Sequence, residues 1–304
     1  TVLWHPERPE GFKEFCAQVS IDTSSVQYEN DSLMRKVRGC DDYGIACCVS
    51  YQAIGKAIQF FGARANLAKA LLLAINGGRC ENTGTLIVEG IKPLSSDVLD
   101  FDEVMDNYKK VMHEVARVYN ETMNIIHYMH DKYDYEKSQM AFIDTNPKIN
   151  LAYGVAGLSI VADSLSAIKY AKVTARRNAE GLTDGFDIEG TFPMFGNDND
   201  LVDVPARDVV QFFNTELSTF MVHRRPGPTL SLLTITSNVM YGKKTGATPD
   251  GREKGVAFAP GANPMHGRDT HGAIASLSSV AKLDYHDSKD GISNTFSIVP
   301  KSLG

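Results

Sequence analysis

The sequence predicts an α/β fold with parallel strands, because long helical patterns alternate along the chain with short apolar runs of strand length. The 304 residues are 43% hydrophobic and 22% charged, which supplies enough apolar material for a sizeable core. We find no internal repeat, no low-complexity linker and no convincing domain boundary. One large domain or two smaller ones would therefore fit this length.

Helical periodicity predicts four helices. In the first, apolar residues recur at three- and four-residue steps from an N-cap at Ser50 to Ile75, with a gap at residues 62–66, and the glycines after Asn76 end the pattern. The others are a long amphipathic helix, a core helix rich in small residues and a further helical stretch, over about 102–141, 153–170 and 204–222.

Short runs with β-branched residues predict the strands. Residues 230–236 and 295–299 have the length and composition of buried strands. Residues 241–268 are rich in glycine and proline, so we predict an ordered set of turns there. Helices and buried strands in this order favour a parallel sheet.

The charge and hydropathy of the chain exclude two classes of partner. A formal charge of −6 gives no general attraction to nucleic acid or to an anionic membrane surface. No apolar run approaches the roughly 18 residues needed to cross a bilayer, and the first residues do not form a signal peptide. We therefore expect a soluble protein that binds neither nucleic acid nor a membrane.

Two of the five cysteines, Cys47 and Cys48, are adjacent. An odd number of cysteines without Cys-x-x-Cys spacing indicates reduced intracellular thiols, and adjacent cysteines could join only through a strained ring that closes no loop. One interpretation is two small buried side chains, which Asp41 and Asp42 favour because they would raise the pKa of a thiol. The other is a pair of thiols that divide labour, one attacking a carbonyl and the other exchanging a hydrogen atom.

Three further residues carry chemistry with two interpretations each. Arg64 lies on a largely apolar segment, so its guanidinium either extends to solvent or pairs with an anion such as a carboxylate. His127 and His130 are three residues apart on a predicted helix and are either structural or metal ligands. A zinc site would need a third ligand from elsewhere.

Several common nucleotide and hydrolase motifs are absent from the sequence. Residues 242–246 read Gly-Lys-Lys-Thr-Gly, which has the wrong order and spacing for a phosphate-binding loop. No Gly-x-Ser-x-Gly elbow and no Gly-x-Gly-x-x-Gly fingerprint occurs either. The hydrolase and dinucleotide-binding classes therefore lack support.

Five segments, taken together, closely resemble the pyruvate formate-lyases (formate C-acetyltransferases), a family of glycyl radical enzymes. The resemblance extends over essentially the whole chain. The segments are SIDTSSVQYEN at 20–30, IACCVS at 45–50, QFFGARANLAK at 59–69, ADSLSAIKYAK at 162–172 and GANPMHGR at 261–268.

The resemblance implies a radical reaction that converts pyruvate and coenzyme A to acetyl-coenzyme A and formate in anaerobic glucose fermentation. It assigns Cys48 as the relay that receives the radical from a backbone glycine, and Cys47 as the thiyl that attacks pyruvate and becomes acetylated. Arg64 matches the family's carboxylate-binding arginine, and Phe61 matches an aromatic residue that lines the pocket. A thiyl needs no lowered pKa, so the acidic neighbours cease to matter.

The resemblance also implies the architecture and the partners. We expect residues 1–304 to form the central-to-C-terminal part of a barrel of two parallel half-sheets surrounded by helices, with the cysteine loop inside. The expected partners are pyruvate, coenzyme A, a radical S-adenosylmethionine activating enzyme and a second subunit of a homodimer, with no bound cofactor and no metal. A cytoplasmic location is expected, or an organelle if a targeting segment precedes Thr1.

The sequence departs from the family in one respect. The motif Arg-Val-[Ser/Thr]-Gly-Tyr, which carries the radical glycine, does not occur, so we expect the glycyl radical domain to be absent. Because the chain begins at Thr1 and stops at Gly304 without a closing element, we expect a piece of a longer protein. Alone it should expose barrel edges and aggregate.

Two alternatives to that function remain. The first is a truncated form that does not catalyse and serves in binding or assembly. The second is an enzyme that acts on 2-ketobutyrate. A diol dehydratase is disfavoured, because those relatives have a glutamate two residues after the cysteine, whereas Val49 and Ser50 stand at that distance from the two cysteines here.

Overall fold

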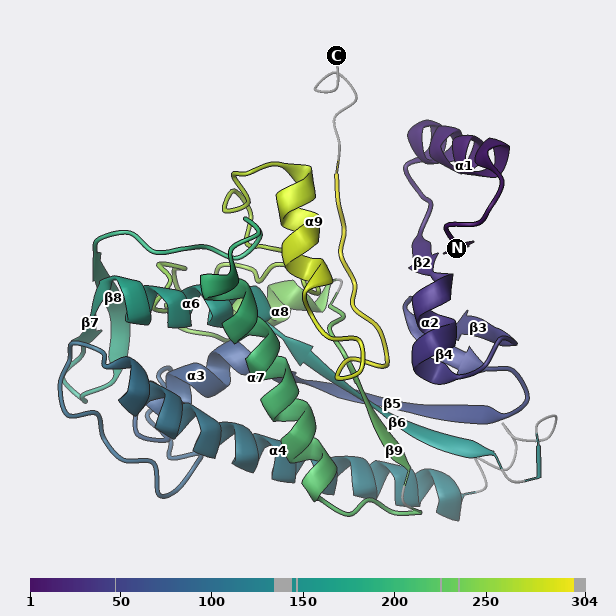
Figure 1. Ribbon diagram of the computed structural model, residues 1–304. Helices are drawn as coiled ribbons and strands as arrows, with labels where there is room; N and C mark the ends of the chain where they lie inside the picture. The colour runs from purple at the N-terminus through teal and green to yellow at the C-terminus, as the bar shows by residue number, and fades with distance from the viewer. Residues whose placement is uncertain (47, 134–143, 146, 225, 235, 298–304) are drawn as a thin grey trace.

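A three-stranded parallel sheet, in the order β5-β6-β9, lies at the centre of the structure (Figure 1). Its strands are β5 (Ala57–Asn66), β6 (Lys148–Ala156) and β9 (Gly227–Ser231). The predicted α/β class is thus confirmed. The computed structural model describes residues 1–46, 48–133, 144–145, 147–224, 226–234 and 236–297. Within these ranges, the side chains of residues 61 and 62 are not described.

Burial explains why β6 forms the middle strand. Every residue from 150 to 156 is buried, as expected for a strand that is covered on both faces. Helices pack against one another and against this sheet: α3 (Leu67–Ile75), α4 (Phe101–Lys132), α6 (Leu158–Tyr170) and α7 (Asp200–Thr219). One continuous hydrophobic core joins the sheet to these helices.

The N-terminal elements form a separate group at one end of the sheet, drawn in purple and dark blue in Figure 1. A small core of Met34, Tyr43 and Tyr51 holds part of this group together, with the two tyrosine rings stacked 4.6 Å apart. The elements are β1 (Val2–Trp4), α1 (Glu10–Thr23), β2 (Tyr28–Asn30), α2 (Asp31–Arg38), β3 (Tyr43–Ala46) and β4 (Ser50–Ala53).

The remaining elements flank the sheet. An antiparallel pair lies at the opposite end from the N-terminal group, and two shorter helices follow β9 in the chain (Figure 1). They are β7 (Lys172–Arg177), β8 (Thr183–Glu189), α8 (Ser237–Lys243) and α9 (Ala273–Ala281). Among the described residues, no helix combines the length and apolarity needed to cross a membrane.

The first predicted helix is wrong before residue 67. Ser50 begins β4 instead of capping a helix, residues 57–66 form β5, and only residues 67–75 are helical. The side chain of Asn66, inside the gap in the apolar pattern, is the true cap because it accepts a hydrogen bond from the backbone N–H of Lys69 at 2.9 Å. Pairing with β6 overrides the helical spacing of the preceding residues.

The other boundaries are corrected in smaller ways. Residues 153–156 belong to β6, and Gly157, whose φ is +85°, turns the chain into α6. Small apolar residues suit a buried strand and a buried helix equally, so periodicity alone could not separate them. The predicted helices over 102–141 and 204–222 become Phe101–Lys132 and Asp200–Thr219, and residues 134–143 lie outside the described part.

The strand and turn predictions are met in part. The strand expected over 230–236 is β9, which begins earlier and ends at Ser231. Residues 295–297 form no strand, and residues 298–299 lie outside the described part. Residues 241–268 are turns, as predicted, once α8 has ended at Lys243.

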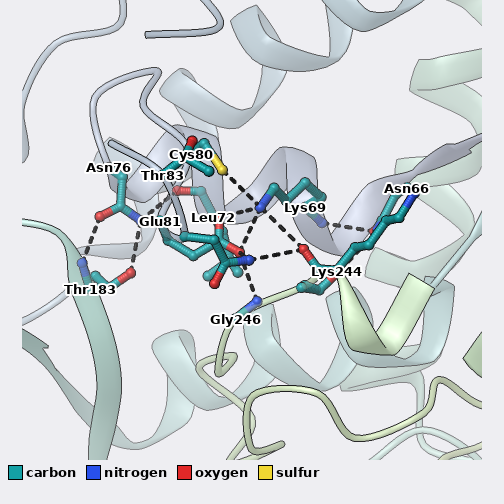
Figure 2. Close-up of polar contacts among 12 residues, drawn as sticks. Asn66, Lys69, Leu72, Asn76, Cys80, Glu81, Thr83, Thr183, Lys244 and Gly246 are labelled. Carbon is teal, nitrogen blue, oxygen red and sulfur yellow. Dashed lines mark hydrogen bonds and ion pairs between the residues drawn. The ribbon is translucent and has the colours of Figure 1, made fainter. Parts of the chain in front are cut away.

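A buried ion pair fixes the point where β5 passes into α3 (Figure 2). The Lys69 ammonium lies 2.7 Å from a carboxylate oxygen of Glu81, whose side chain is only 1% exposed. It also donates to the Cys80 sulfur at 3.2 Å, and the Gly246 N–H donates to Glu81 at 2.7 Å. The pair therefore ties the start of α3 to the loop that follows this helix and, through Glu81, to the loop at Gly246, which is distant in sequence.

Replacing Lys69 by methionine should destabilise the protein strongly. The substitution leaves the Glu81 carboxylate buried without its cation, which costs about 3–5 kcal/mol. The thermal unfolding midpoint of the full-length protein measures this loss. The matched control is Lys172→Met, which breaks an exposed pair with Glu189 and should cost about 0–1 kcal/mol. Equal midpoints for the two variants would contradict the assignment.

Candidate active site

Cys48 lies in the turn of the antiparallel hairpin formed by β3 and β4. The last paired residues before the turn are Ala46 and Ser50, and Cys48 and Val49 lie between them. Cys47, the predicted attacking thiol, lies outside the described residues. Cys48 therefore lies on a loop, as the resemblance implied.

The side chain of Gln27 supports this turn from the N-terminal group. Its amide nitrogen donates to the backbone carbonyl of Cys48, and also to the Glu29 carboxylate at 2.6 Å. Burial raises the pKa of Glu29, and the hydrogen bond from Gln27 partly offsets that increase. The segment at 20–30, which carries part of the family resemblance, thus contacts the cysteine turn directly.

Arg64 lies near the end of β5, and its side chain crosses the sheet. Arg64 is paired with Gly154 of β6, which is paired in turn with Ser231 of β9. A Cβ atom at position 154 would lie only 2.7 Å from the Cγ of Arg64, so glycine leaves the room for the arginine stem. The Arg64 Nε donates to the carbonyl of Leu233. The guanidinium therefore has a fixed direction.

Tyr119 of α4 holds the irregular part of β5 in place. Its hydroxyl donates to the carbonyl of Ala63 and accepts from the N–H of Gly154 at 3.0 Å. The pairing of β5 with β6 shifts register between Phe61 and Arg64, so this phenol bridges the two strands at the shift. Burial raises the pKa of Tyr119, which keeps the hydroxyl protonated.

The backbone of Phe61 pairs with β6, but its side chain lies outside the described part.

A buried carboxyl group, Asp290, lies between the hairpin and β5. Its side chain accepts a hydrogen bond from the amide of Gln59 on β5. Burial raises the pKa of Asp290 to about 6, while hydrogen bonds from Gln59 and Ser50 and the charges of Arg38 and Arg64 oppose the increase. Sequence reasoning missed this residue because it lies in a coil segment with no recognised motif.

His127 and His130, the two histidines noted in the sequence, pack against aromatic rings. His127 is fully buried, and its ring lies 4.6 Å from that of Phe60 and 5.2 Å from that of His223. Burial, together with the charges of His223 and Arg224, lowers the pKa of His127 to about 4. His130 also faces Phe60, at 5.6 Å. Within the described part of the chain, no three His, Cys, Asp or Glu side chains gather as a metal site would require.

Residues 242–246 serve internal contacts. The Thr245 hydroxyl accepts from the Asn66 amide at 3.0 Å, and Gly246 contacts Glu81 as described above.

Nearby, burial alone would raise the pKa of Cys80, but hydrogen bonds from Thr83, the Asn82 backbone and Lys69 outweigh it and lower that pKa. Cys80 is thus a thiol with a lowered pKa that sequence reasoning did not single out.

Two of the segments that carry the resemblance meet through one guanidinium. Arg268 donates to Asp163 and to Asp250, each at 2.6 Å, and both carboxylates are fully buried. Burial raises the pKa of Asp163 to about 7, with the Arg268 charge lowering it and the Asp250 charge adding to the increase. This network binds α6 to the glycine-rich loop at 261–268.

Comparisons with solved structures give the class of fold. A glycyl radical enzyme from Archaeoglobus fulgidus superposes with a TM-score of 0.73 at 20% identity, over 93% of this chain and 40% of that one. The B12-independent glycerol dehydratase from Clostridium butyricum superposes with a TM-score of 0.75 at 24% identity, over 94% of this chain and 40% of that one. The chain therefore has the fold of a glycyl radical enzyme, as the resemblance implied.

Sequence comparison gives the family. The family model described as pyruvate formate lyase-like matches residues 1–242. Formate acetyltransferase 1 of Escherichia coli (strain K12) is 56% identical over 304 residues, which is all of this chain and 40% of that protein. The chain belongs to the pyruvate formate lyase-like family, and it spans well under half the length of this relative.

A second family model, described as glycine radical, matches residues 258–304. This match differs from the expectation that the glycyl radical domain is absent from the chain. The expectation rested on the missing Arg-Val-[Ser/Thr]-Gly-Tyr motif, and that motif still does not occur in the 304 residues. The chain thus carries a stretch assigned to the glycine radical model without the motif that bears the radical.

Stability should depend on pH through Asp163. Because its pKa is raised in the folded state, the stabilising contribution of the protonated group is present below about pH 4 and is lost as pH rises through about 7. Asp163→Asn cannot titrate. Between pH 5 and 7 the free energy of unfolding of the full-length wild type should therefore fall relative to that of the variant by roughly 2 kcal/mol. Parallel curves for the two proteins would refute this.

Proposed function

We propose that the complete protein to which this chain belongs is a formate C-acetyltransferase that converts pyruvate and coenzyme A to acetyl-coenzyme A and formate. One observation carries the proposal: the hairpin that contains Cys48 is hydrogen-bonded through Ser50 to the buried carboxyl group of Asp290, and the charge of Arg64 acts on the same carboxyl group. The 56% identity to a formate acetyltransferase supports the same activity.

The proposed reaction uses the cysteine pair in two roles. Cys48 receives the radical and passes it to Cys47, whose thiyl adds to the carbonyl carbon of pyruvate. The bond between the carbonyl and carboxyl carbons then breaks, which leaves an acetyl thioester on Cys47 and a carboxyl radical anion. That anion takes a hydrogen atom from a thiol and becomes formate. Finally the acetyl group moves to coenzyme A, whose thiol proton returns to Cys47, so atoms and electrons balance.

Arg64 is proposed to hold the pyruvate carboxylate. A guanidinium binds a carboxylate through two parallel hydrogen bonds, which fixes the direction of the substrate as well as its position. The carbonyl of Leu233 and the space above Gly154 determine where this guanidinium points. The carbonyl carbon of pyruvate would thereby be held close to the attacking sulfur.

The surroundings of the turn suit radical chemistry. Val49, directly after Cys48, is 7% exposed, and Asp290 is fully buried. Exclusion of water limits the side reactions of a reactive intermediate. We also propose a radical S-adenosylmethionine activating enzyme, which generates the glycine radical, and a second copy of the subunit as partners of the complete protein. Both proposals follow from the family resemblance.

The decisive assay uses the full-length gene product, activated without oxygen and supplied with pyruvate and coenzyme A. Wild type should produce formate and acetyl-coenzyme A. Cys47→Ser and Cys48→Ser should each abolish both products, because a serine hydroxyl does not exchange a hydrogen atom as readily as a thiol. Cys16→Ser is the matched control, since this thiol is buried in α1 and should not affect the rate.

Activity that survives in either active-site variant would return that cysteine to a structural role. An activated wild type that makes no formate would overturn the proposed activity. Supplying 2-ketobutyrate in place of pyruvate separates the two substrates in the same assay.

Gly154→Ala should weaken substrate binding through Arg64. The added methyl group displaces the arginine stem, and a lost charge-assisted hydrogen bond costs about 1.5–3 kcal/mol, so KM for pyruvate should rise roughly 10- to 100-fold. The matched control is Gly227→Ala on β9, where a methyl group would lie no closer than 3.9 Å to its nearest neighbour. Unchanged KM in Gly154→Ala would show that Arg64 does not bind the carboxylate.

A further inference from the structure

The segment that follows α9 continues the central sheet beyond β9. The N–H of Asp290 donates to the carbonyl of Leu230 at 2.9 Å, and the N–H of Leu232 donates to the carbonyl of Gly291 at 3.0 Å. The N–H of Ser293 then donates to the carbonyl of Leu232 at 3.0 Å. These bonds form a short parallel ladder, which gives residues 290–293 a fixed position beside β9.

Gly291 touches the cysteine turn so closely that no larger residue fits. A Cβ atom at position 291 would lie 2.7 Å from both the Cβ and the carbonyl oxygen of Val49. The φ angle of Gly291 is +106°, which residues with a side chain rarely adopt. The backbone directly after Cys48 therefore rests on the backbone of Gly291.

Asp290, the residue before Gly291, connects this part of the chain to β5. Its side chain is fully buried and accepts from Gln59, while its backbone pairs with Leu230 of β9. The charged groups that face it are Arg38, at the end of α2, and Arg64 on β5. Two consecutive residues thus join the hairpin, β5 and the edge of β9.

Leu232 and Leu233 connect Gly291 to Arg64. Leu232 is bonded to Gly291, and the next residue, Leu233, accepts the hydrogen bond from Arg64. The turn that carries Cys48 and the guanidinium are therefore held by neighbouring residues of one ladder. Asp290 and Gly291 also lie within 258–304, the stretch that the glycine radical model matches.

We propose that Asp290 and Gly291 are positioning residues that set the location of the cysteine turn relative to Arg64. The inference rests on the proposed function, which gives these two groups their roles. Gly291 fixes how closely the turn approaches the sheet, and Asp290 fixes Gly291 by anchoring it to β5. The distance between the attacking sulfur and the carboxylate bound by Arg64 then depends on the contact between Gly291 and Val49, in which neither the sulfur nor Arg64 takes part.

Gly291→Ala tests the contact in the full-length protein. Amide hydrogen exchange of the peptide that covers β3 and β4 should become roughly tenfold faster, because the methyl group pushes the turn off its support. In the activated enzyme, kcat should fall about 100-fold, as for a misplacement of about 1 Å, while KM for pyruvate changes little. The peptide that covers β6 should keep its protection.

Gly272→Ala is the matched control. Gly272 also has a positive φ, +87°, but a Cβ atom there would meet nothing within 4 Å. This variant carries a similar backbone strain without the clash, so its hairpin exchange and kcat should equal those of wild type. If Gly291→Ala matches this control in both measurements, the inference is wrong. It is also wrong if Gly291→Ala accelerates exchange equally throughout the sheet, since that is a loss of general stability.

A second pair of variants decides the matter if Gly291→Ala does not fold. Asp290→Leu removes the acceptor for Gln59, whereas Asp290→Asn retains it at nearly the same size. The leucine variant should show faster hairpin exchange, and the asparagine variant should restore protection; identical behaviour of the two would refute the anchoring role. Because exchange is measured without turnover, this result stands even if the wild type makes no formate.

Discussion

The parallel pairing of β5 with β6 and of β6 with β9 is the constraint on which the site depends. This ladder places Arg64, Gly154 and Ser231 in one row across three strands. Since β6 is buried on both faces, its register cannot slip without repacking the close-packed side chains on both of them. The location of the guanidinium is therefore a property of the sheet and not of the loop that would bind a substrate.

The absence of a side chain at two glycines is the second constraint, and each glycine lets a different group approach its backbone closely. At Gly154 the missing side chain makes room for another side chain, the stem of Arg64. At Gly291 it makes room for another backbone, that of Val49 in the cysteine turn. Both positions lie in the interior, where a methyl group cannot be accommodated by solvent and the neighbours are held by ladder hydrogen bonds.

The sequence predicted the class of fold, the long helices and the segments that hold the candidate site, because those features depend on composition, period and motif. It failed where two structures share a pattern: the apolar residues within 57–66 and 153–156 fit a helix and a strand alike, and only their partners across the sheet decide that they are strands. Tyr119 and Asp290 were missed for a related reason. A tyrosine on an amphipathic helix and an aspartate in a coil are ordinary residues until tertiary contacts bring them together with Gly154 and Gln59.

The separation in sequence between the cysteine turn and its support has a consequence during synthesis. Gln59 and Asp290 are 231 residues apart, and the contact of Gly291 with Val49 spans a similar length of chain. At roughly 5–20 residues per second, a ribosome needs on the order of ten seconds or more to make the intervening chain. The hairpin thus emerges with Gln27 already present but without Asp290 and Gly291, which complete its surroundings only after the intervening chain has been synthesised. In a nascent chain the site is therefore exposed to oxidants for a period that translation speed determines.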